Sequence, residues 1–522
     1  MKKYNSILWI YIVVLLCLVT SCGKVSTVGK PADEEASQEV SEEAASESGE
    51  NASGGETQDS ENENREPGAE LPVPEREEIV FGDEQFEEYL PLLEGKRVAL
   101  LTNQTGIVGD KIVEAGAESE SDAVGEAADE TAGADSPGAT IATGVTDAAA
   151  AEYAQVDTTL IPFGKDAEDN DITYGQHILD ALLERGVQVE AVFCPEHGFR
   201  GTEDAGAEVG DTVDDETGVP VISLYGSGKR GPDSEDMDRF DVLVVDIQEV
   251  GLRYYTYYIT MYSLMDACAE AGKEVLILDR PNPNGFYVDG PILQDEYKSG
   301  VGMLPLPVVY GLTLGELAQM INGEGWLDSG KDACDLTVIP CRNYTHRDKI
   351  PLIRRPSPNL KDMRAIYLYA STCFFENTLV SVGRGTENPF EIYGSPYLED
   401  VEGFGFSFTP QSMSGASNPP FEGETCWGVD LRDVPIEDIF SAGINVSYLV
   451  DAYHAVTEAS PGNSFWGSPD GSGQYWIDKL SGSSELRQMI EDGATAEEIK
   501  DSWQEDILNF LEQRKPYLLY EE

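Results

Sequence analysis

Three side chains with catalytic chemistry follow one another in residues 193–201, Phe-Cys-Pro-Glu-His-Gly-Phe-Arg-Gly. The apolar run before them predicts a buried strand that stops at Pro195, and Glu196, His197 and Arg200 come directly after it. In open α/β sheets, ligands bind outside the carboxyl ends of the strands. We therefore predict that Glu196 and His197 are catalytic and that Arg200 binds substrate.

A second polar cluster occupies residues 246–257, Asp-Ile-Gln-Glu-Val-Gly-Leu-Arg-Tyr-Tyr-Thr-Tyr, after another apolar run. It offers two carboxylates, Asp246 and Glu249, as further catalytic candidates. Arg253 and Tyr255 are candidates for substrate binding. The alternative is structural: acidic residues are favoured at a helix start by the helix dipole, and the tyrosines would pack in the core.

Two more predicted strand ends are polar. The first predicted strand ends next to Asn103, and a later one ends in residues 279–285, Asp-Arg-Pro-Asn-Pro-Asn-Gly. We expect Asn103, Asp279, Arg280 and Asn282 to contact substrate, with the Asn282 amide suited to a sugar hydroxyl. Asp279 and Arg280 could instead pair with each other.

A fourth cluster lies further along the chain. Glu376 stands among aromatic residues, and Arg384 stands between two glycines. An accessible guanidinium suits an anionic ligand group, because its fork of N–H donors matches a carboxylate. Both residues are candidate substrate contacts, and an ion pair between them is the alternative.

The elements that must position these residues alternate between strand and helix. We expect strands at 98–101, 187–193, 219–224, 241–246 and 275–278, and helices at 177–185, 256–271 and 313–322. Such alternation predicts an α/β domain with a parallel sheet covered on both faces. We place this domain at 79–309 and a smaller mixed α+β domain at 310–522. Its helical segments are expected at 436–440, 447–457, 484–492 and 495–513.

The N-terminus is typical of a targeting segment. Lys2 and Lys3 precede an apolar run at 7–19, and the Val-Thr-Ser-Cys that ends at Cys22 resembles a bacterial lipobox. Residues 1–22 are therefore interpreted as a lipoprotein signal peptide with Cys22 as the lipidated residue. This predicts an extracytoplasmic protein anchored to the cell membrane. An ordinary secretory signal and a single membrane helix are the alternatives.

Two acidic segments of low complexity are expected to be disordered. Residues 23–78 contain 17 acids and 4 bases, and residues 110–171 contain 16 acids and 2 bases. Both lack the apolar side chains that folding requires. We interpret the first as a tether and the second as an insertion in the first domain. The chain without these two segments and without residues 1–22 still accounts for −38 of the net charge of −63, which argues against nucleic acid as a partner.

Several other kinds of site are disfavoured. Residues 226–231 match the dinucleotide pattern Gly-x-Gly-x-x-Gly, but too few residues follow for the required helix. Only His197 is placed for catalysis, so we predict no metal site and no cofactor. Of the six cysteines outside the signal segment, Cys334 and Cys341 could form a local disulfide, and buried thiols are the alternative.

Eight motifs in this order resemble the exo-β-N-acetylmuramidase family (NamZ-like proteins, formerly the DUF1343 domain family). They are LTNQTG, CPEHGFRG, GVPVISLYG, DIQEVGLRYYTYY, LDRPNPNG, YGLTLGELA, PSPNL and FFENTLVSVGRGT, and they span the chain from about Lys96 to the C-terminus. The resemblance implies a Rossmann-like domain, a smaller C-terminal domain and an active site in the cleft between them. It implies removal of terminal N-acetylmuramic acid from the non-reducing ends of peptidoglycan fragments.

The family's leading catalytic candidate falls on Glu196, and Glu249 replaces the aspartate usual in the family's DIQDVG motif. Glycoside hydrolysis normally uses two carboxyl groups. We expect Glu196 to be the general acid, supported by His197, with Glu249 or Asp246 as its partner and Glu376 as a third candidate. The substrate's own N-acetyl group is an alternative for the second role. A muropeptide-binding lipoprotein without activity, and a hydrolase of another amino sugar, are the competing functions.

Overall fold

The computed structural model describes residues 77–109, 175–196, 198–199, 210–224, 231–331, 333–352 and 354–522. The predicted signal segment with Cys22, nearly all of the tether, the insertion, His197 and Arg200 lie outside these residues. All described residues belong to one compact unit, Glu75–Glu522.

A seven-stranded sheet forms the centre of the first part of this unit, in the order β3-β4-β2-β1-β5-β6-β7. Only β3 runs antiparallel to its neighbour; the other strands are parallel. The strands are β1 (Arg97–Leu101), β2 (Gln188–Cys194), β3 (Thr212–Val213), β4 (Pro220–Ser223), β5 (Val242–Val245), β6 (Glu274–Leu278) and β7 (Asp335–Ile339).

The parallel strands follow the Rossmann order, with the first strand at the centre and the chain turning outward on both sides of it. Val98 of β1 pairs with Val189 of β2 on one side and with Val242 of β5 on the other. The switch point therefore lies between β1 and β5. The loops that leave β1, β2 and β5 meet at this edge of the sheet.

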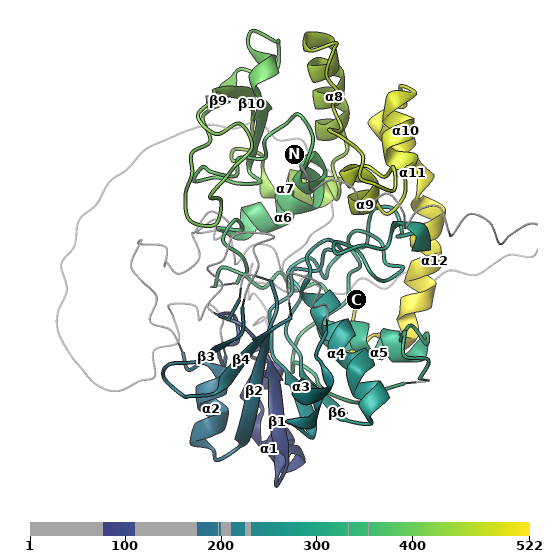
Figure 1. The fold of residues 1–522 in the computed structure, drawn as a ribbon. Helices are drawn as coiled ribbons and strands as arrows, with labels where there is room; N and C mark the ends of the chain where they lie inside the picture. Colours follow the sequence, from purple (N-terminus) through teal and green to yellow (C-terminus); the bar gives the residue numbers. More distant parts are fainter. Residues whose placement is uncertain are drawn as a thin grey trace, which may run out of the picture. The chain divides into compact units, whose positions relative to one another are not determined.

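Helices cover both faces of the sheet, as Figure 1 shows. Val98 and Leu100 pack in a core with α1 (Phe86–Leu93) and α2 (Ile178–Glu184). Ala99 and Leu101 belong to a larger core with α4 (Tyr257–Ala271) and α5 (Leu314–Gly323), and the short α3 (Ser234–Asp238) joins β4 to β5. Alternate residues of each strand thus enter opposite cores, which is the reason for the nearly continuous apolar strands.

The second part combines a small sheet with helices. Its three antiparallel strands lie in the order β8-β10-β9. They are β8 (Ile392–Ser395), β9 (Phe406–Phe408) and β10 (Cys426–Asp430). The helices are α6 (Met363–Thr372), α7 (Ile436–Ala442), α8 (Ser447–Ala459), α9 (Trp476–Ser481), α10 (Glu485–Glu491), α11 (Ala496–Ser502) and α12 (Gln504–Arg514). The predicted fold class, a parallel α/β domain with a smaller α+β domain, is confirmed.

The domain boundary predicted at residue 310 falls inside the first sheet. α5 follows that residue, and β7 then pairs in parallel with β6 from Glu274 opposite Asp335 onward. The sequence of β7 did not predict a strand because its residues alternate between exposed and half-buried positions at the sheet edge. The helix predicted at 495–513 is divided at Trp503, whose indole Nε1 donates to Asp289 Oδ1 (2.9 Å).

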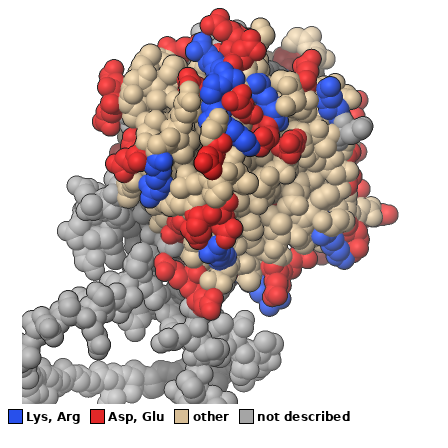
Figure 2. Space-filling view, turned by 90° about the horizontal axis from the view of Figure 1, so that it is seen from below, with Lys and Arg blue, Asp and Glu red and all other residues tan. Residues whose placement is uncertain are grey.

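Charged side chains of both signs are interspersed over the face shown in Figure 2. Several partly exposed ion pairs occur, including Arg97 with Asp241 (2.7 Å) and Lys96 with Glu274 (2.6 Å). None of the helices formed by the described residues is both long and apolar enough to span a bilayer.

Candidate active site

Glu196 lies just past the end of β2, beside the switch point of the sheet. Its Oε2 accepts a hydrogen bond of 2.8 Å from the Thr256 hydroxyl. Thr256 is the N-cap of α4, but its hydroxyl does not cap the helix. The side chain that would ordinarily satisfy a backbone N–H there is instead directed at a carboxylate. Glu196 is partly exposed, so both solvent and a ligand can reach this carboxylate.

The residues on both sides of Thr256 connect this carboxylate to a later loop. The Tyr255 and Tyr257 hydroxyls both donate to the Pro356 carbonyl, at 2.8 and 2.7 Å. Gln104, from the loop after β1, donates to the same carbonyl at 3.2 Å. Burial, and after it the nearby Glu196 carboxylate, raises the pKa of Tyr257 well above its usual range. Three polar strand ends and the PSPNL loop therefore meet beside Glu196.

The cluster predicted around Glu376 adjoins this region through Tyr254. The Tyr254 hydroxyl donates to the carbonyls of Tyr369 and Ala370, at 2.9 and 2.8 Å. Arg384 donates twice to one oxygen of Glu376, from Nε at 2.8 Å and from Nη2 at 2.6 Å. The alternative interpretation of these two residues as an ion pair is therefore confirmed. Both side chains remain about one-fifth exposed.

Asp246 does not have the environment expected of a catalytic carboxylate. It has no exposed surface and accepts from Arg280 Nε at 2.6 Å. Arg280 also pairs with Asp83 at 2.6 Å. Burial raises the pKa of Asp83 to about 8, and the neighbouring Asp246 adds to this while Arg280 opposes it. The predicted roles of Asp246 in catalysis and of Arg280 in substrate binding are both corrected, because these side chains neutralise each other inside the protein.

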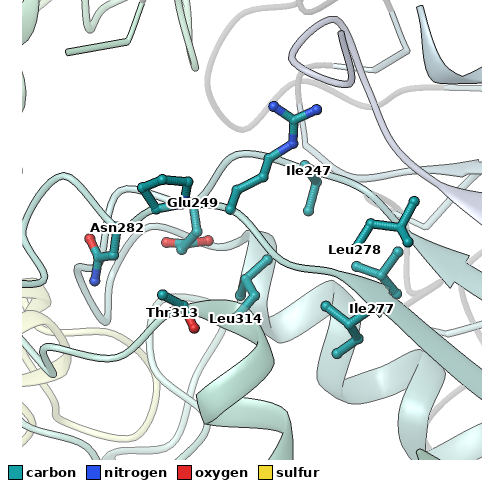
Figure 3. A pocket seen from close by; sticks show the side chains of 10 residues that line it. Ile247, Glu249, Ile277, Leu278, Asn282, Thr313 and Leu314 are labelled. Carbon is teal, nitrogen blue, oxygen red and sulfur yellow. The ribbon is translucent and has the colours of Figure 1, made fainter. Parts of the chain in front are cut away.

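Glu249 is also buried, but beside a small cavity. Figure 3 shows its carboxylate beside Asn282 and facing Thr313 and Leu314 at the start of α5. The cavity measures ≈ 10 Å³, about the room for one water molecule, and Glu196 is not among its lining residues. Neither oxygen of Glu249 has a hydrogen-bond partner of good geometry among the described residues. Desolvation raises its pKa well above the usual range, and its buried environment differs from the accessible one expected of a catalytic partner.

The Arg253 side chain links separate loops through hydrogen bonds. It is fully buried and donates to the carbonyls of Pro291 (2.7 Å) and Leu480 (2.8 Å). Burial lowers its pKa to about 10. A substrate carboxylate has no path to this guanidinium, so the substrate-binding role predicted for Arg253 is corrected to a structural one. Tyr255, also predicted to bind substrate, lies at the candidate site, but its hydroxyl donates to the Pro356 carbonyl.

The remaining predicted contacts are mostly structural. Asp279 does not pair with Arg280; it accepts from the Thr313 and Tyr520 hydroxyls, both at 2.6 Å. Asn282 donates to the Leu312 carbonyl (2.9 Å) and packs against Gly251, whose φ of 77° and lack of a Cβ allow the close approach. These bonds join the loop after β6 to the start of α5 and to the C-terminal segment, so the substrate-binding roles predicted for Asp279 and Asn282 are corrected.

Asn103 is buried at the end of β1. Its Oδ1 accepts from the Thr105 hydroxyl at 2.6 Å, and its Nδ2 is buried without a partner among the residues the structure describes. His177 caps α2, because its Nδ1 accepts from the Leu179 N–H (3.2 Å). Its Nε2 lies 2.9 Å from the Asn103 carbonyl. His177 also contacts Phe199, three residues after Glu196, edge to face.

Sequence reasoning missed Thr256, Gln104 and the loop around Pro356 as parts of the site. Thr256 was visible only as a likely helix start. Gln104 and Pro356 belong to motifs, LTNQTG and PSPNL, that were noted without a role. Their separation in the sequence hid the contact, since Gln104 and Pro356 lie 252 residues apart.

Metal and thiol chemistry find no support within the described part of the chain. No group of three His, Cys, Asp or Glu residues there is arranged to hold a metal ion. The six described cysteines, including Cys334 and Cys341, are buried thiols. The disulfide considered for Cys334 and Cys341 is not formed.

Comparison with known proteins agrees with this arrangement. The family model for the N-terminal part of exo-β-N-acetylmuramidase NamZ matches residues 169–364, and the model for the C-terminal part matches residues 367–520. The peptidoglycan β-N-acetylmuramidase NamZ of Bacillus subtilis (strain 168) is 37% identical over 367 residues, which cover 66% of this chain and 82% of that protein. The chain belongs to the NamZ exo-β-N-acetylmuramidase family. β1 lies before the N-terminal match, although it is central in the sheet.

Two solved structures have the same fold. A DUF1343 family protein from Bacteroides fragilis NCTC 9343 is 43% identical, with a TM-score of 0.66, and the match covers 85% of this chain and 100% of that one. A second DUF1343 family protein from the same organism is 27% identical, with a TM-score of 0.61, over 85% and 99% of the two chains. Each of the two matches covers 85% of this chain, so the likeness in fold extends over both its first and its second part.

Proposed function

We propose that this protein is an exo-acting glycoside hydrolase that releases terminal N-acetylmuramic acid from the non-reducing ends of peptidoglycan fragments. Glu196 carries this proposal: it is a partly exposed carboxylate at the carboxyl end of β2, next to the switch point, and it accepts from Thr256. The family and the B. subtilis relative support the reaction class.

In the proposed reaction, Glu196 is the general acid. Its proton passes to the glycosidic oxygen as the bond between that oxygen and C1 of the muramyl residue breaks. The Thr256 hydroxyl fixes the orientation of the carboxyl group throughout, because Thr256 is held between two anchored tyrosines.

We assign the second role to the substrate's own acetamido oxygen. The three predicted partner carboxylates are engaged elsewhere: Asp246 with Arg280, Glu376 with Arg384, and Glu249 in an enclosed cavity. The acetamido oxygen would attack C1 as the leaving group departs and form a cyclic intermediate. The Glu196 carboxylate would then take a proton from the water that opens this ring, so the product sugar keeps the β configuration.

The test measures release of N-acetylmuramic acid from 4-nitrophenyl β-N-acetylmuraminide and from the disaccharide with N-acetylglucosamine. On the disaccharide, whose alcohol leaving group must be protonated, Glu196→Gln should lower kcat by about 10²- to 10⁴-fold, the usual contribution of a general acid. The loss should be smaller on the 4-nitrophenyl compound, because 4-nitrophenolate leaves without that proton. Glu190→Gln, on the same strand and away from its carboxyl end, is the matched control and should keep full activity. An unchanged rate in Glu196→Gln would exclude this residue as the acid. Release of N-acetylglucosamine alone, or recovery of intact ligand, would refute the proposed substrate or the activity itself.

We further propose that the protein acts outside the cytoplasm, attached to the membrane by a lipid on Cys22. The basic start, the short apolar run and the small residues before Cys22 support this. The Cys22→Ala protein should lose incorporation of labelled fatty acid and leave the membrane fraction. Retention of the label by this variant would refute the anchor.

A further inference from the structure

The loop that reaches the candidate site through Pro356 carries two adjacent arginines, Arg354 and Arg355. Gln104 Nε2 donates to the Arg355 carbonyl at 3.1 Å and to the Pro356 carbonyl at 3.2 Å. The hydroxyls of Tyr255 and Tyr257 anchor Pro356 from the other strand end. The backbone of Arg355 is therefore fixed beside the residues that flank Thr256, the hydrogen-bond donor to Glu196.

The other side of this loop is also tied down. Asn359 Nδ2 donates to the Gly415 carbonyl at 2.8 Å, and residues 356–360 are buried. Lys361 Nζ donates to the Thr386 carbonyl (3.0 Å) and pairs with Glu387 (2.9 Å). The loop thus has a fixed position between the two parts of the fold. A side chain that extends from it is attached to a rigid backbone.

Positive charge gathers here in a chain whose net charge is −63. Lys361, and to a lesser degree Arg355, lowers the pKa of Glu387, so Arg355 lies close enough to act on that carboxylate. Arg384 lies two residues before Thr386 and pairs with Glu376. We call this group the arginine patch, and it comprises Arg354, Arg355, Lys361, Glu376, Arg384 and Glu387. Within it, Lys361 pairs with Glu387 and Arg384 pairs with Glu376, so the Arg355 guanidinium adds positive charge beyond these two pairs.

Among the cations of the site, Arg355 has the guanidinium best placed for a ligand. Arg253, the earlier candidate, is buried against carbonyls. Arg384 gives two of its N–H groups to Glu376. The Arg355 side chain is exposed and makes no hydrogen bond or ion pair with any described residue. A guanidinium on a fixed backbone loses less freedom when it binds, and its fork geometry matches a carboxylate.

We propose that Arg355 binds the lactyl carboxylate of the terminal muramyl residue and so selects muramic acid over glucosamine. This inference rests on the proposed function. The two sugars differ only in the lactyl ether, so discrimination requires contacts to that group. A carboxylate contact supplies both binding and a charge requirement that N-acetylglucosamine does not meet.

The experiment compares wild type, Arg355→Gln and Arg97→Gln on three chromogenic substrates. These are 4-nitrophenyl β-N-acetylmuraminide, the same compound with its lactyl carboxylate converted to the amide, and 4-nitrophenyl β-N-acetylglucosaminide. Arg97 is an exposed, ion-paired arginine at the amino end of β1, so its substitution changes the net charge equally at the far edge of the sheet. Gln104 bonds the backbone carbonyl of Arg355 and not its side chain, so the Arg355→Gln substitution leaves this hydrogen bond intact.

For Arg355→Gln we expect KM for the muraminide to rise about tenfold, with little change in kcat, and KM for the amide to stay as in wild type. Arg97→Gln should match wild type on all substrates. Higher salt should raise the wild-type KM for the muraminide and not for the amide. Equal KM values for wild type and Arg355→Gln, or an equal rise on muraminide and amide, would overturn the role of Arg355. A wild type that hydrolyses none of the muraminides would instead refute the proposed function, and this inference with it.

Discussion

The ends of β2 and β5 carry the same kind of residue at the same edge of the sheet, yet their carboxylates differ in almost every physical respect. Glu196, after β2, is partly exposed and bonded by a neutral hydroxyl. Asp246 and Glu249, after β5, are buried, one paired with Arg280 and the other beside a cavity of ≈ 10 Å³. Of these three carboxylates, Glu196 is the one with exposed surface, which the general acid of the proposed reaction needs.

The buried side of this comparison has a structural purpose. Arg280 and its two carboxylates join the loop after β6, the loop after β5 and the segment before α1. Such a cluster fixes these three segments on the β5 and β6 side of β1, whereas Glu196 lies on the β2 side. The difference teaches that carboxylates at one edge of a sheet can either belong to the framework or stay accessible to a ligand.

The largest expected contrast is between Glu196→Gln and Glu249→Gln. The first should lose about 10²- to 10⁴-fold in kcat. The second should stay within about threefold of wild type, because the raised pKa of Glu249 means that glutamine replaces an already neutral group of the same shape. Steady-state kinetics on the disaccharide of N-acetylmuramic acid and N-acetylglucosamine, whose leaving group must be protonated, measures this contrast. A loss in Glu249→Gln as large as that in Glu196→Gln would restore Glu249 as a catalytic partner.

Arg280→Met should be the most destabilising substitution at the edge of the sheet. It leaves the Asp246 carboxylate buried without a cation and removes a hydrogen-bond donor from Asp83, and breaking a buried pair in this way costs about 3–5 kcal/mol. Denaturant unfolding measures the loss. Arg384→Met, which breaks the partly exposed pair with Glu376, is the matched control and should cost less. Equal losses in the two variants would contradict the assignment of Arg280 to the framework.

Asp83 should make stability depend on pH. Its pKa is about 8 in the folded protein and 3.8 ordinarily, so between these values the folded state holds a proton that the unfolded state has lost. This contribution is complete below about pH 4 and is lost as the pH rises through 8. Asp83→Asn cannot ionise and should lose less stability between pH 5 and pH 8, by about 2 kcal/mol, in urea titrations at the two pH values. Parallel losses in both proteins would place the titration elsewhere.

Thr256→Val should have the smallest effect. It removes one hydrogen bond to Glu196 and keeps the shape of the side chain, so kcat should fall about five- to tenfold. Thr256→Ser, which keeps the hydroxyl, should recover most of the rate. The unfolding midpoint should not move in either variant. A similar loss in the serine variant would show that packing, and not the hydrogen bond, matters at this position.

Local features were predictable from the sequence because their causes lie within a few residues. The Thr313–Glu316 capping box forms as expected, with both reciprocal bonds. The strands at β1, β2, β4, β5 and β6 agree with the expected ranges within one residue at each end. In contrast, β7 escaped prediction, since an edge strand with exposed residues lacks the apolar pattern of its buried neighbours.

Which polar residues form the site was not predictable in the same way. Arg280 could have paired with Asp279 next to it, but its partners lie 34 and 197 residues away. Arg253 and Arg355 are the same residue type in polar stretches, and only the folded chain shows that one is buried and the other exposed.

The sequence by itself determined the α/β class, the position of Glu196 at the carboxyl edge of the sheet and the acidic character of the chain. The reason is that apolar periodicity, residues that end a strand and charge are all properties of neighbouring residues. The tertiary structure alone decided which carboxylates are neutralised and which arginine faces solvent. Burial and ion pairing depend on residues that folding brings together from distant strands, so local sequence patterns do not predict them.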